Sequence, residues 1–332
     1  MTRLAIPITL AISSYDHVSE LRYGGVSIEG VDPLFIELPI PEIFRRFREW
    51  EVSEMSSAKY VALRSSGDDS IHAIPVFTSR LFRHSCIYVR RGKIKAPEDL
   101  IGANVGVPSW SMTAGVYARG MLSDMYQVRS QDISWIQAGL DRPGRSEPIR
   151  LPSLPDEVSI RSNQVGTLED MLWSGELDAV ISPAVPESFA RSADAGGPIG
   201  PLFPDAASAE RSYFNATGIF PIMHLVVLRR DIVEAHPWIA TNLYRAFEVA
   251  KRRYFQRLED IAASRVPIPW IGEHLANIKE ALGGDPWPYG VAPNRVALEA
   301  LIRYSSEQWI LTRDIAVDEL FLNVETFVDG LT

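Results

Sequence analysis

The 332-residue sequence contains a single cysteine, Cys86, so no disulfide can form within the chain. A chain without disulfides is typical of a reducing compartment. An excess of positive charge is also lacking: the formal net charge is −9, which argues against a general nucleic-acid-binding surface. No apolar run approaches the roughly 20 residues that a membrane span needs. We therefore predict neither a nucleic-acid partner nor membrane insertion, although local basic groups can still bind an acidic ligand.

The pattern of the first residues predicts a strand and not a secretory signal. The apolar stretch from Leu4 to Ile12 is interrupted by Pro7 and Thr9 and alternates like a strand, and no cysteine follows that could carry a lipid. We therefore predict a cytoplasmic protein.

Several motifs that carry chemistry are absent. The sequence has no glycine-rich phosphate loop, no paired-cysteine zinc motif, no His-Glu-x-x-His and no Gly-x-Ser-x-Gly elbow. We therefore predict no metal and no cofactor, because the spacing of the ligating residues supports neither. Two alternatives stay open at this point: a serine triad without the elbow, and scattered His and Asp residues that converge on a metal.

Segments of strand and helix character alternate along the chain, which predicts an α/β fold with parallel or mixed sheets. In such sheets, ligands bind at the polar loops that follow the carboxyl ends of the strands. The length is sufficient for two domains of ordinary size. Expected strands lie at 4–12, 31–38, 52–56, 71–77, 85–90, 103–107, 133–136, 177–182 and 219–228. Expected helices lie at 39–50, 57–65, 97–101, 114–126, 167–174, 237–261, 293–309 and 317–324.

A set of short motifs spans nearly the whole chain in a fixed order. They are 53–56, 74–85, 105–108, 112–114, 118–120, 175–179, 217–224, 236–238 and 287–290. Through these segments the chain resembles the 4,5-dihydroxyphthalate decarboxylase family, whose fold is that of type 2 periplasmic binding proteins. The resemblance implies two lobes joined by two crossing strands, with a ligand cleft between them. Lobe 1 would be discontinuous, with residues 1–95 and 220–332 and both chain ends, and lobe 2 would hold residues 96–219.

The resemblance also implies a function. A family member would remove one carboxylate from an aromatic dicarboxylate such as 4,5-dihydroxyphthalate, without a cofactor, and release protocatechuate during phthalate degradation. One departure concerns the substrate: Tyr15-Asp16-His17 stands where Tyr-Asp-Arg is expected. An arginine can bind a carboxylate with two parallel hydrogen bonds and a histidine cannot, so the substrate of this chain can differ from that of the family.

Three basic residues follow the predicted strand at 71–77, where a cleft loop is expected. Arg80 and Arg83 are candidates for binding a substrate carboxylate, because the guanidinium fork pairs with both oxygens. His84 is a candidate catalytic residue. The alternative for this segment is a solvated turn, in which Phe82 packs inward and the charged groups face water.

Two further residues are candidates for acid–base chemistry. His224 lies in an apolar segment where the chain returns to lobe 1, and imidazole titrates near neutrality. Glu54 follows a strand and is a candidate base for a substrate hydroxyl. The alternatives are that His224 is a hydrogen-bonded core residue and that Glu54 caps the next helix.

The remaining candidates are substrate-binding residues at strand ends. Ser109, Ser111 and Thr113 precede a predicted helix, whose free N–H groups can bind an anion, although ordinary helix capping explains the same residues. Candidates after the first strand and on the opposite wall are Tyr15, Asp16, His17 and Ser182.

Two other functions stay open. The first is a solute-binding protein that captures a small anionic or aromatic ligand without reaction. The second is hydrolysis or isomerisation by the same acid and base. In each case the expected partner is a small molecule, an aromatic carboxylate for the enzyme, and the sequence leaves homo-oligomer formation open.

Overall fold

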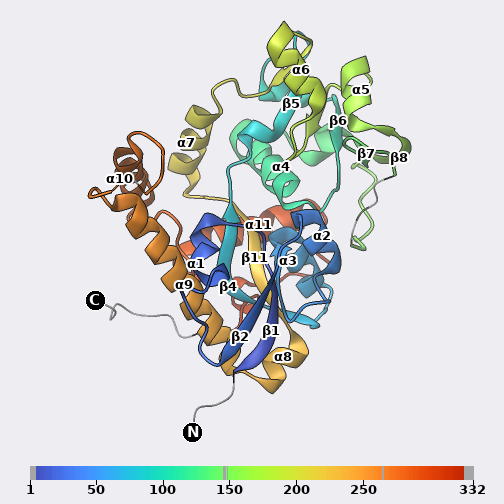
Figure 1. The fold of residues 1–332 in the computed structure, drawn as a ribbon. Coiled ribbons are helices and arrows are strands. Elements are labelled where there is room, and N and C mark those ends of the chain that lie inside the picture. The colour runs from blue at the N-terminus through green and yellow to red at the C-terminus, as the bar shows by residue number, and fades with distance from the viewer. Residues whose placement is uncertain (1–4, 145–146, 148, 264, 325–332) are drawn as a thin grey trace.

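The computed structural model describes residues 5–144, 147, 149–263 and 265–324. Its strands form two separate sheets, each with helices packed around it, and Figure 1 shows one sheet above the other. The predicted α/β fold with mixed sheets is confirmed.

The first sheet has the strand order β2-β1-β3-β11-β4. Strand β11 runs antiparallel to both of its neighbours, and the others are parallel. Its strands are β1 (Ile6–Ala11), β2 (Val31–Ile36), β3 (Val52–Ser56), β4 (Ile71–Arg80) and β11 (Ile222–Arg229).

The second sheet has the order β10-β5-β9-β6-β7-β8, in which β5 is antiparallel to β9 and β10. Its strands are β5 (Ile87–Arg90), β6 (Asn104–Val107), β7 (Ser134–Gly139), β8 (Ile160–Thr167), β9 (Ala179–Ile181) and β10 (Ile199–Pro201).

The helices connect and cover these strands. They are α1 (Ser19–Arg22), α2 (Ile40–Arg46), α3 (Ser57–Ser65), α4 (Thr113–Tyr126), α5 (Leu168–Ser174), α6 (Glu187–Ala195), α7 (Ala206–Thr217), α8 (Arg230–Ala235), α9 (Trp238–Glu259), α10 (Ile271–Leu282) and α11 (Arg295–Glu307). Short 3-10 turns are η1 (Asp16–Val18), η2 (His84–Cys86), η3 (Pro97–Leu100), η4 (Ser130–Asp132), η5 (Ala292–Asn294) and η6 (Val317–Glu319).

The chain passes between the sheets twice. It leaves the first sheet after β4, through η2, and returns from α7 into β11. Because β5 pairs within the second sheet, we propose that the first lobe boundary falls between β4 and β5, earlier than the residue 95 expected from the sequence. We place the second boundary before β11, close to the expected residue 220.

Local sequence explains several element ends. The helix expected at 57–65 is α3, and the expected cap of α5 is present, since the Thr167 hydroxyl accepts a hydrogen bond from the Asp170 N–H at 3.1 Å. The helix expected at 317–324 is wrong: η6 is a single 3-10 turn, and Phe321 then forms a bridge with Ala73. Strands β8 and β10 and helices α1, α6, α7, α8 and α10 were not predicted, and the helix expected at 97–101 is the 3-10 turn η3.

The two lobes share one buried apolar cluster, and within it α4 packs on α11. Gly120 of α4 faces the ring of Tyr304 on α11 so closely that a Cβ would lie 2.3 Å from the ring. The Tyr117 hydroxyl donates to the Ala297 carbonyl at 2.9 Å, and the Arg119 Nε donates to the Gln308 side chain at 2.7 Å. These contacts fix α4 against the first lobe.

We predict that Gly120→Ala destabilises the protein by about 1–3 kcal/mol, because the added methyl group forces α4 away from Tyr304. Urea unfolding measures the change. Gly272→Ala in α10 is the matched control, since its Cβ would meet no atom within 4 Å, and it should be neutral or slightly stabilising. Equal stability of the two variants would contradict the close packing of α4 on α11.

Candidate active site

One edge of the first sheet brings together three of the predicted site residues. Strands β1 and β3 end there and the antiparallel β11 begins there. Tyr15 follows β1, Glu54 lies near the end of β3, and His224 lies near the start of β11. His224 pairs in register with Ser56 of β3, two residues after Glu54. Residues far apart in the sequence therefore meet at this edge because of the strand order.

The side chains of these residues form a hydrogen-bonded network. The His224 Nδ1 lies 2.6 Å from the Glu54 Oε1, and the Tyr15 hydroxyl lies 3.0 Å from the same ring nitrogen. The Tyr15 hydroxyl also donates to Glu54 Oε1, and the Ser13 N–H donates to Glu54 Oε2 at 2.9 Å. The predicted catalytic residues Glu54 and His224 and the predicted binding residue Tyr15 are thus in direct contact.

The network favours an ionised Glu54. Burial opposes ionisation of this fully enclosed carboxyl, but the hydrogen bond and charge of His224, the Tyr15 hydroxyl and the Ser13 N–H together hold its pKa below the ordinary range. The pKa of Tyr15 is raised by its burial, by the negative charge of Glu54 and by the hydrogen bond to it. Tyr15 therefore stays protonated and serves as a donor.

An ionised Glu54 orients the imidazole of His224. A carboxylate at Nδ1 retains a proton there, so that Nε2 is the nitrogen that exchanges protons. No hydrogen-bond partner of Nε2 is found in the part of the chain that the structure describes, and Phe44 packs edge-on against the ring with centroids 4.8 Å apart. The arrangement can deliver a proton to a ligand or remove one from it.

A second cluster lies at the start of α4, in the second lobe. The Trp110 N–H donates to the Glu147 carboxylate at 2.7 Å and the Ser111 N–H at 3.4 Å. The Ser109 hydroxyl donates to both carboxylate oxygens, at 3.1 and 3.0 Å, and the Ser111 hydroxyl also donates to one of them. We call these donors of Ser109, Trp110 and Ser111 the carboxylate cradle, because a carboxylate occupies them.

The cradle and the network lie next to each other across the two lobes. Thr113, the first residue of α4, is 2.8 Å from the Ser56 hydroxyl through its own hydroxyl oxygen. The same oxygen accepts a hydrogen bond from the Ala58 N–H of α3 at 3.0 Å. Thr113 thus ties the lobes together, and its hydroxyl is already occupied, which favours a structural role over the predicted ligand contact.

Two of the predicted residues, Arg80 and His84, are buried outside the Glu54–His224 network. Arg80 is buried and donates to the Asn294 side chain and the Phe220 carbonyl, both at 2.8 Å, and stacks on the Phe220 ring. This contact set favours a structural role for Arg80. His84 is 2% exposed, packs against Phe203 and Tyr213, and has no partner for either ring nitrogen in the described chain. It does not contact Glu54 or His224.

The other predicted residues occupy different positions around the two clusters. Arg83 is half-buried, donates to the Met223 sulfur at 3.0 Å, and forms no ion pair with a described carboxylate. Ser182 follows β9 and its buried hydroxyl has no described partner. Asp16 is exposed, outside the network.

His17 lies between Tyr15 and Trp287, with ring centroids 5.5 and 5.4 Å away. Its Nε2 is buried and without a partner in the described residues. Burial, with the positive charge of Lys251, lowers the pKa of His17 to about 4, against a smaller opposing effect of Glu54. His17 is therefore neutral at physiological pH and cannot replace an arginine as a cation.

Sequence reasoning missed Glu147, Lys59 and Phe44. Glu147 lies in a segment rich in proline, glycine and arginine that reads only as a loop, and no pattern distinguishes its carboxylate from the others. Lys59 belongs to the first turn of α3, where a lysine is ordinarily solvated, yet it is 7% exposed.

Two negative findings apply to the described residues. They contain no group of three or more His, Cys, Asp or Glu side chains positioned to hold a metal ion. None of their helices is long and apolar enough to cross a membrane.

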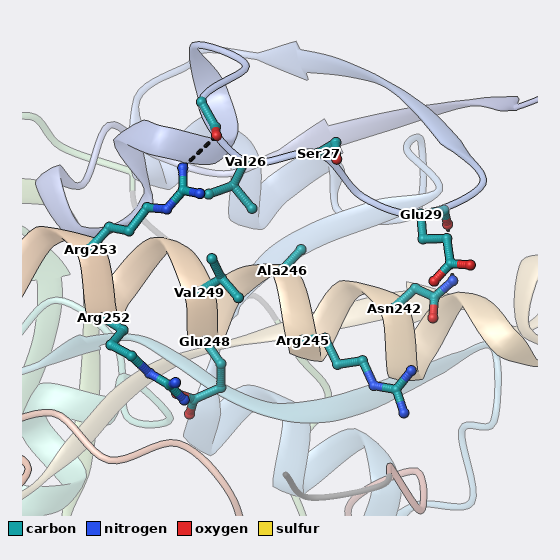
Figure 2. A pocket seen from close by; sticks show the side chains of 11 residues that line it. Val26, Ser27, Glu29, Asn242, Arg245, Ala246, Glu248, Val249, Arg252 and Arg253 are labelled. Atoms are coloured by element: carbon teal, nitrogen blue, oxygen red, sulfur yellow. Dashed lines mark hydrogen bonds between the residues drawn. The ribbon is translucent and has the colours of Figure 1, made fainter. Parts of the chain in front are cut away.

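A groove of about 310 Å³ lies between α9 and the segment that precedes β2 (Figure 2). Val26, Ala246 and Val249 form its apolar part, and Arg253 donates to the Gly25 carbonyl at 2.6 Å. It shares no lining residue with the network or the cradle.

Comparison with curated proteins identifies the family. A 4,5-dihydroxyphthalate decarboxylase from Comamonas testosteroni is 36% identical over 322 residues, which cover 95% of this chain and 96% of that protein. A second 4,5-dihydroxyphthalate decarboxylase, from Pseudomonas putida, is 35% identical over 214 residues, or 63% of this chain and 81% of that protein. The chain belongs to the 4,5-dihydroxyphthalate decarboxylase family. This decarboxylase is thus a carboxy-lyase, as the sequence predicts.

Solved structures confirm the predicted fold. The periplasmic sulfonate-binding protein SsuA from Methylobacillus flagellatus matches with a TM-score of 0.53 and 11% identity, covering 97% of the decarboxylase and 92% of that chain. The alkanesulfonate-binding protein SsuA from Xanthomonas axonopodis matches with a TM-score of 0.52 and 10% identity, covering 96% and 99%. At this identity the likeness concerns the periplasmic-binding-protein fold alone. No family model matches the chain.

We predict that His84→Leu makes the decarboxylase less sensitive to acid. Burial lowers the pKa of His84 to about 4, so the unfolded chain binds a proton between pH 6.5 and 4 that the folded chain does not. Stability therefore falls as pH decreases through this window. Between pH 7 and pH 5, the free energy of unfolding should fall by about 1–2 kcal/mol less in the variant than in the wild type.

Urea unfolding at the two pH values measures this difference. His274→Leu is the control, because His274 is exposed on α10 and should leave the pH dependence unchanged. An identical pH dependence in wild type and His84→Leu would mean that His84 titrates normally in the folded protein.

Proposed function

We propose that the protein decarboxylates 4,5-dihydroxyphthalate to protocatechuate in the cleft between the two sheets. The observation that carries the proposal is the buried Glu54–His224 pair next to a cradle shaped for a carboxylate. The names of the two family relatives supply the substrate. We retain the cytoplasm as the proposed location.

The reaction exchanges a carboxylate for a proton on the ring. The hydroxyl para to the leaving carboxylate donates electron density to the carbon that bears it, and that carbon accepts a proton. The C–C bond then breaks, its electron pair restores the aromatic ring, and carbon dioxide leaves. No electron acceptor takes part, so the residues need only bind, orient and move protons.

His224 is the proposed proton donor. Its Nε2 would protonate the substrate's ring carbon while Glu54 stabilises the imidazolium through Nδ1. The imidazole of His224 would then regain a proton from solvent. Tyr15 would donate a hydrogen bond at the same wall, since its hydroxyl stays protonated. Phe44 partly shields this wall from water.

The cradle is the proposed site of the carboxylate that remains on the product. Its hydroxyls and N–H groups already bind a carboxylate, and hydrogen bonds to charged groups are strong. We propose Arg83 rather than Arg80 as the additional cation, because Arg83 lacks a described carboxylate partner and Arg80 is occupied by Asn294 and Phe220. Neutral His17 would suit a ring hydroxyl.

The first prediction for this function is carbon dioxide release. Purified, chelator-treated protein incubated with 4,5-dihydroxyphthalate should release carbon dioxide at a rate proportional to protein concentration. Binding without release, with or without added divalent metal, would instead support a solute-binding protein or another reaction.

A second prediction concerns His224. His224→Gln should lower kcat by about 10²- to 10⁴-fold, because the amide cannot transfer a proton. Steady-state kinetics with 4,5-dihydroxyphthalate gives the ratio, and KM should change much less. His274→Gln, an exposed histidine far from the network in sequence, is the control and should retain the wild-type rate. Wild-type turnover in His224→Gln would remove the proposed proton donor.

A third prediction concerns the cradle. Replacing Ser109 and Ser111 together by alanine should raise KM about 10- to 100-fold, because two hydrogen bonds to a charged group are lost. A change confined to kcat would mean that the serines do not bind the ground-state carboxylate.

A further inference from the structure

The cradle is filled by a side chain of the same protein. Glu147 accepts hydrogen bonds from two hydroxyls and two N–H groups, which is the arrangement that a substrate carboxylate would require. Ser109 and Ser111 are 2% and 1% exposed, so donors in an empty cradle would be cut off from most water. Unpaired buried donors are unfavourable, and Glu147 supplies acceptors for these.

The hydrogen bonds that Glu147 accepts from described residues all come from the cradle, and none of the donors is a basic side chain. Two buried basic side chains respond to its charge: Arg119 of α4, which donates to the Trp110 carbonyl at 2.6 Å, and Lys59 of α3. The guanidinium of Arg119 is already stacked on the Trp110 ring, which leaves Lys59 as the candidate cation for an incoming anion. The Lys59 ammonium donates to the Phe44 carbonyl at 3.0 Å and lies 4.9 Å from the centre of the Phe47 ring. One such bond leaves two of its three donors without a protein acceptor in the described residues.

The position of Lys59 connects the cradle with the network. Its neighbour Ala58 donates to Thr113 at the start of α4, and Phe44, its acceptor, packs against His224. Burial, aided by Arg48 and opposed by Glu147, lowers the pKa of Lys59 to about 8, so the amine is still largely protonated at pH 7. Lys59 thus places a positive charge between the two halves of the site.

Lys59 also lines a groove of about 700 Å³. Most of the other lining residues come from the end of α2 and the two residues after it, from α3, and from the segment 149–153. Its basic residues are Arg45, Arg48, Lys59 and Arg150, and none of its lining residues is acidic. Glu147 precedes this segment by two residues, and the described residues between β7 and β8 form no helix or strand. Displacing Glu147 into the groove would therefore break no backbone ladder.

We propose that Glu147 is a built-in carboxylate that occupies the substrate's carboxylate site, and that the substrate displaces it while Lys59 contributes positive charge to that site. This inference rests on the proposed function for the identity of the substrate. It adds Glu147 as an internal competitor and Lys59 as a residue that positions the anion.

The exchange has a measurable consequence for affinity. Only molecules in which Glu147 has left the cradle can bind. The apparent Kd is therefore the intrinsic Kd divided by the fraction of such molecules. Removing the competitor should therefore strengthen binding. Removing Lys59 should weaken binding whether or not Glu147 is present, because its charge serves either carboxylate.

The test uses phthalate, the diacid without ring hydroxyls, so that binding is measured without the proposed reaction. Isothermal titration calorimetry on the full chain should give about tenfold tighter binding for Glu147→Gln and Glu147→Ala than for wild type. Glu157→Gln is the matched control, since Glu157 is an exposed carboxylate in the same connection and should leave the affinity unchanged. Lys59→Met should bind about tenfold more weakly than wild type, with unfolding curves confirming that it is folded.

A double-mutant cycle locates the effect. In a protein that already carries Ser109→Ala and Ser111→Ala, Glu147→Ala should bring no further gain. Unchanged, weaker or undetectable phthalate binding in both Glu147 variants overturns the proposal. It is also overturned if Glu147→Ala strengthens binding by the same factor in the protein that lacks both serines. Tighter phthalate binding in a protein that releases no carbon dioxide would support the exchange and reject the proposed reaction.

Discussion

The buried carboxylate of Glu54 is the constraint on which the site depends. A fully enclosed charge is unfavourable by several kcal/mol unless it is paired and hydrogen-bonded. Its partners come from three places: the N–H of Ser13 and the hydroxyl of Tyr15 after β1, and the imidazole of His224 at the start of β11. The charge is tolerated only when β1 and β11 flank β3, so the strand order that satisfies Glu54 also assembles the acid–base group.

The second half of the site depends on a different contact. Helix α4 belongs to the second lobe but packs on α11 of the first, where Gly120 permits the close approach of Tyr304. This packing directs the start of α4 towards the start of α3, where Thr113 meets Ser56 and Ala58. The cradle immediately precedes Thr113. Its distance from the network is therefore set by packing about two helical turns away, in residues that contact no ligand.

The sequence selects three residues that the structure brings together, but it gives no indication of the cradle's occupant, for a physical reason. Glu54, His224 and Tyr15 each lie near a strand end, and parallel topology brings such ends to one edge, so local pattern is sufficient. The choice between Arg80 and Arg83 depends on which guanidinium finds an acceptor, and Asn294 is 214 residues away from Arg80. Likewise Lys59 reads as a solvated helix residue, and its burial follows from contact with Phe44 and Phe47, which periodicity does not encode. Strands β8 and β10 escaped prediction because β8 is polar and largely exposed and β10 has three residues.

The two halves of the site also differ in charge, and in the proposed reaction this difference decides which carboxylate leaves. The cradle offers four hydrogen-bond donors, with the Lys59 ammonium nearby, and stabilises a negative charge. The network offers the imidazole of His224, and the anionic Glu54 behind it balances the charge of an imidazolium, so the pair attracts a carboxylate less strongly than the cradle does. A diacid bound across the cleft would have one carboxylate held firmly in the cradle and the other beside the proton donor. The proton that replaces the departing carboxylate comes from the imidazolium that Glu54 stabilises. The same buried carboxylate would thus act both in the orientation of the diacid and in the proton transfer.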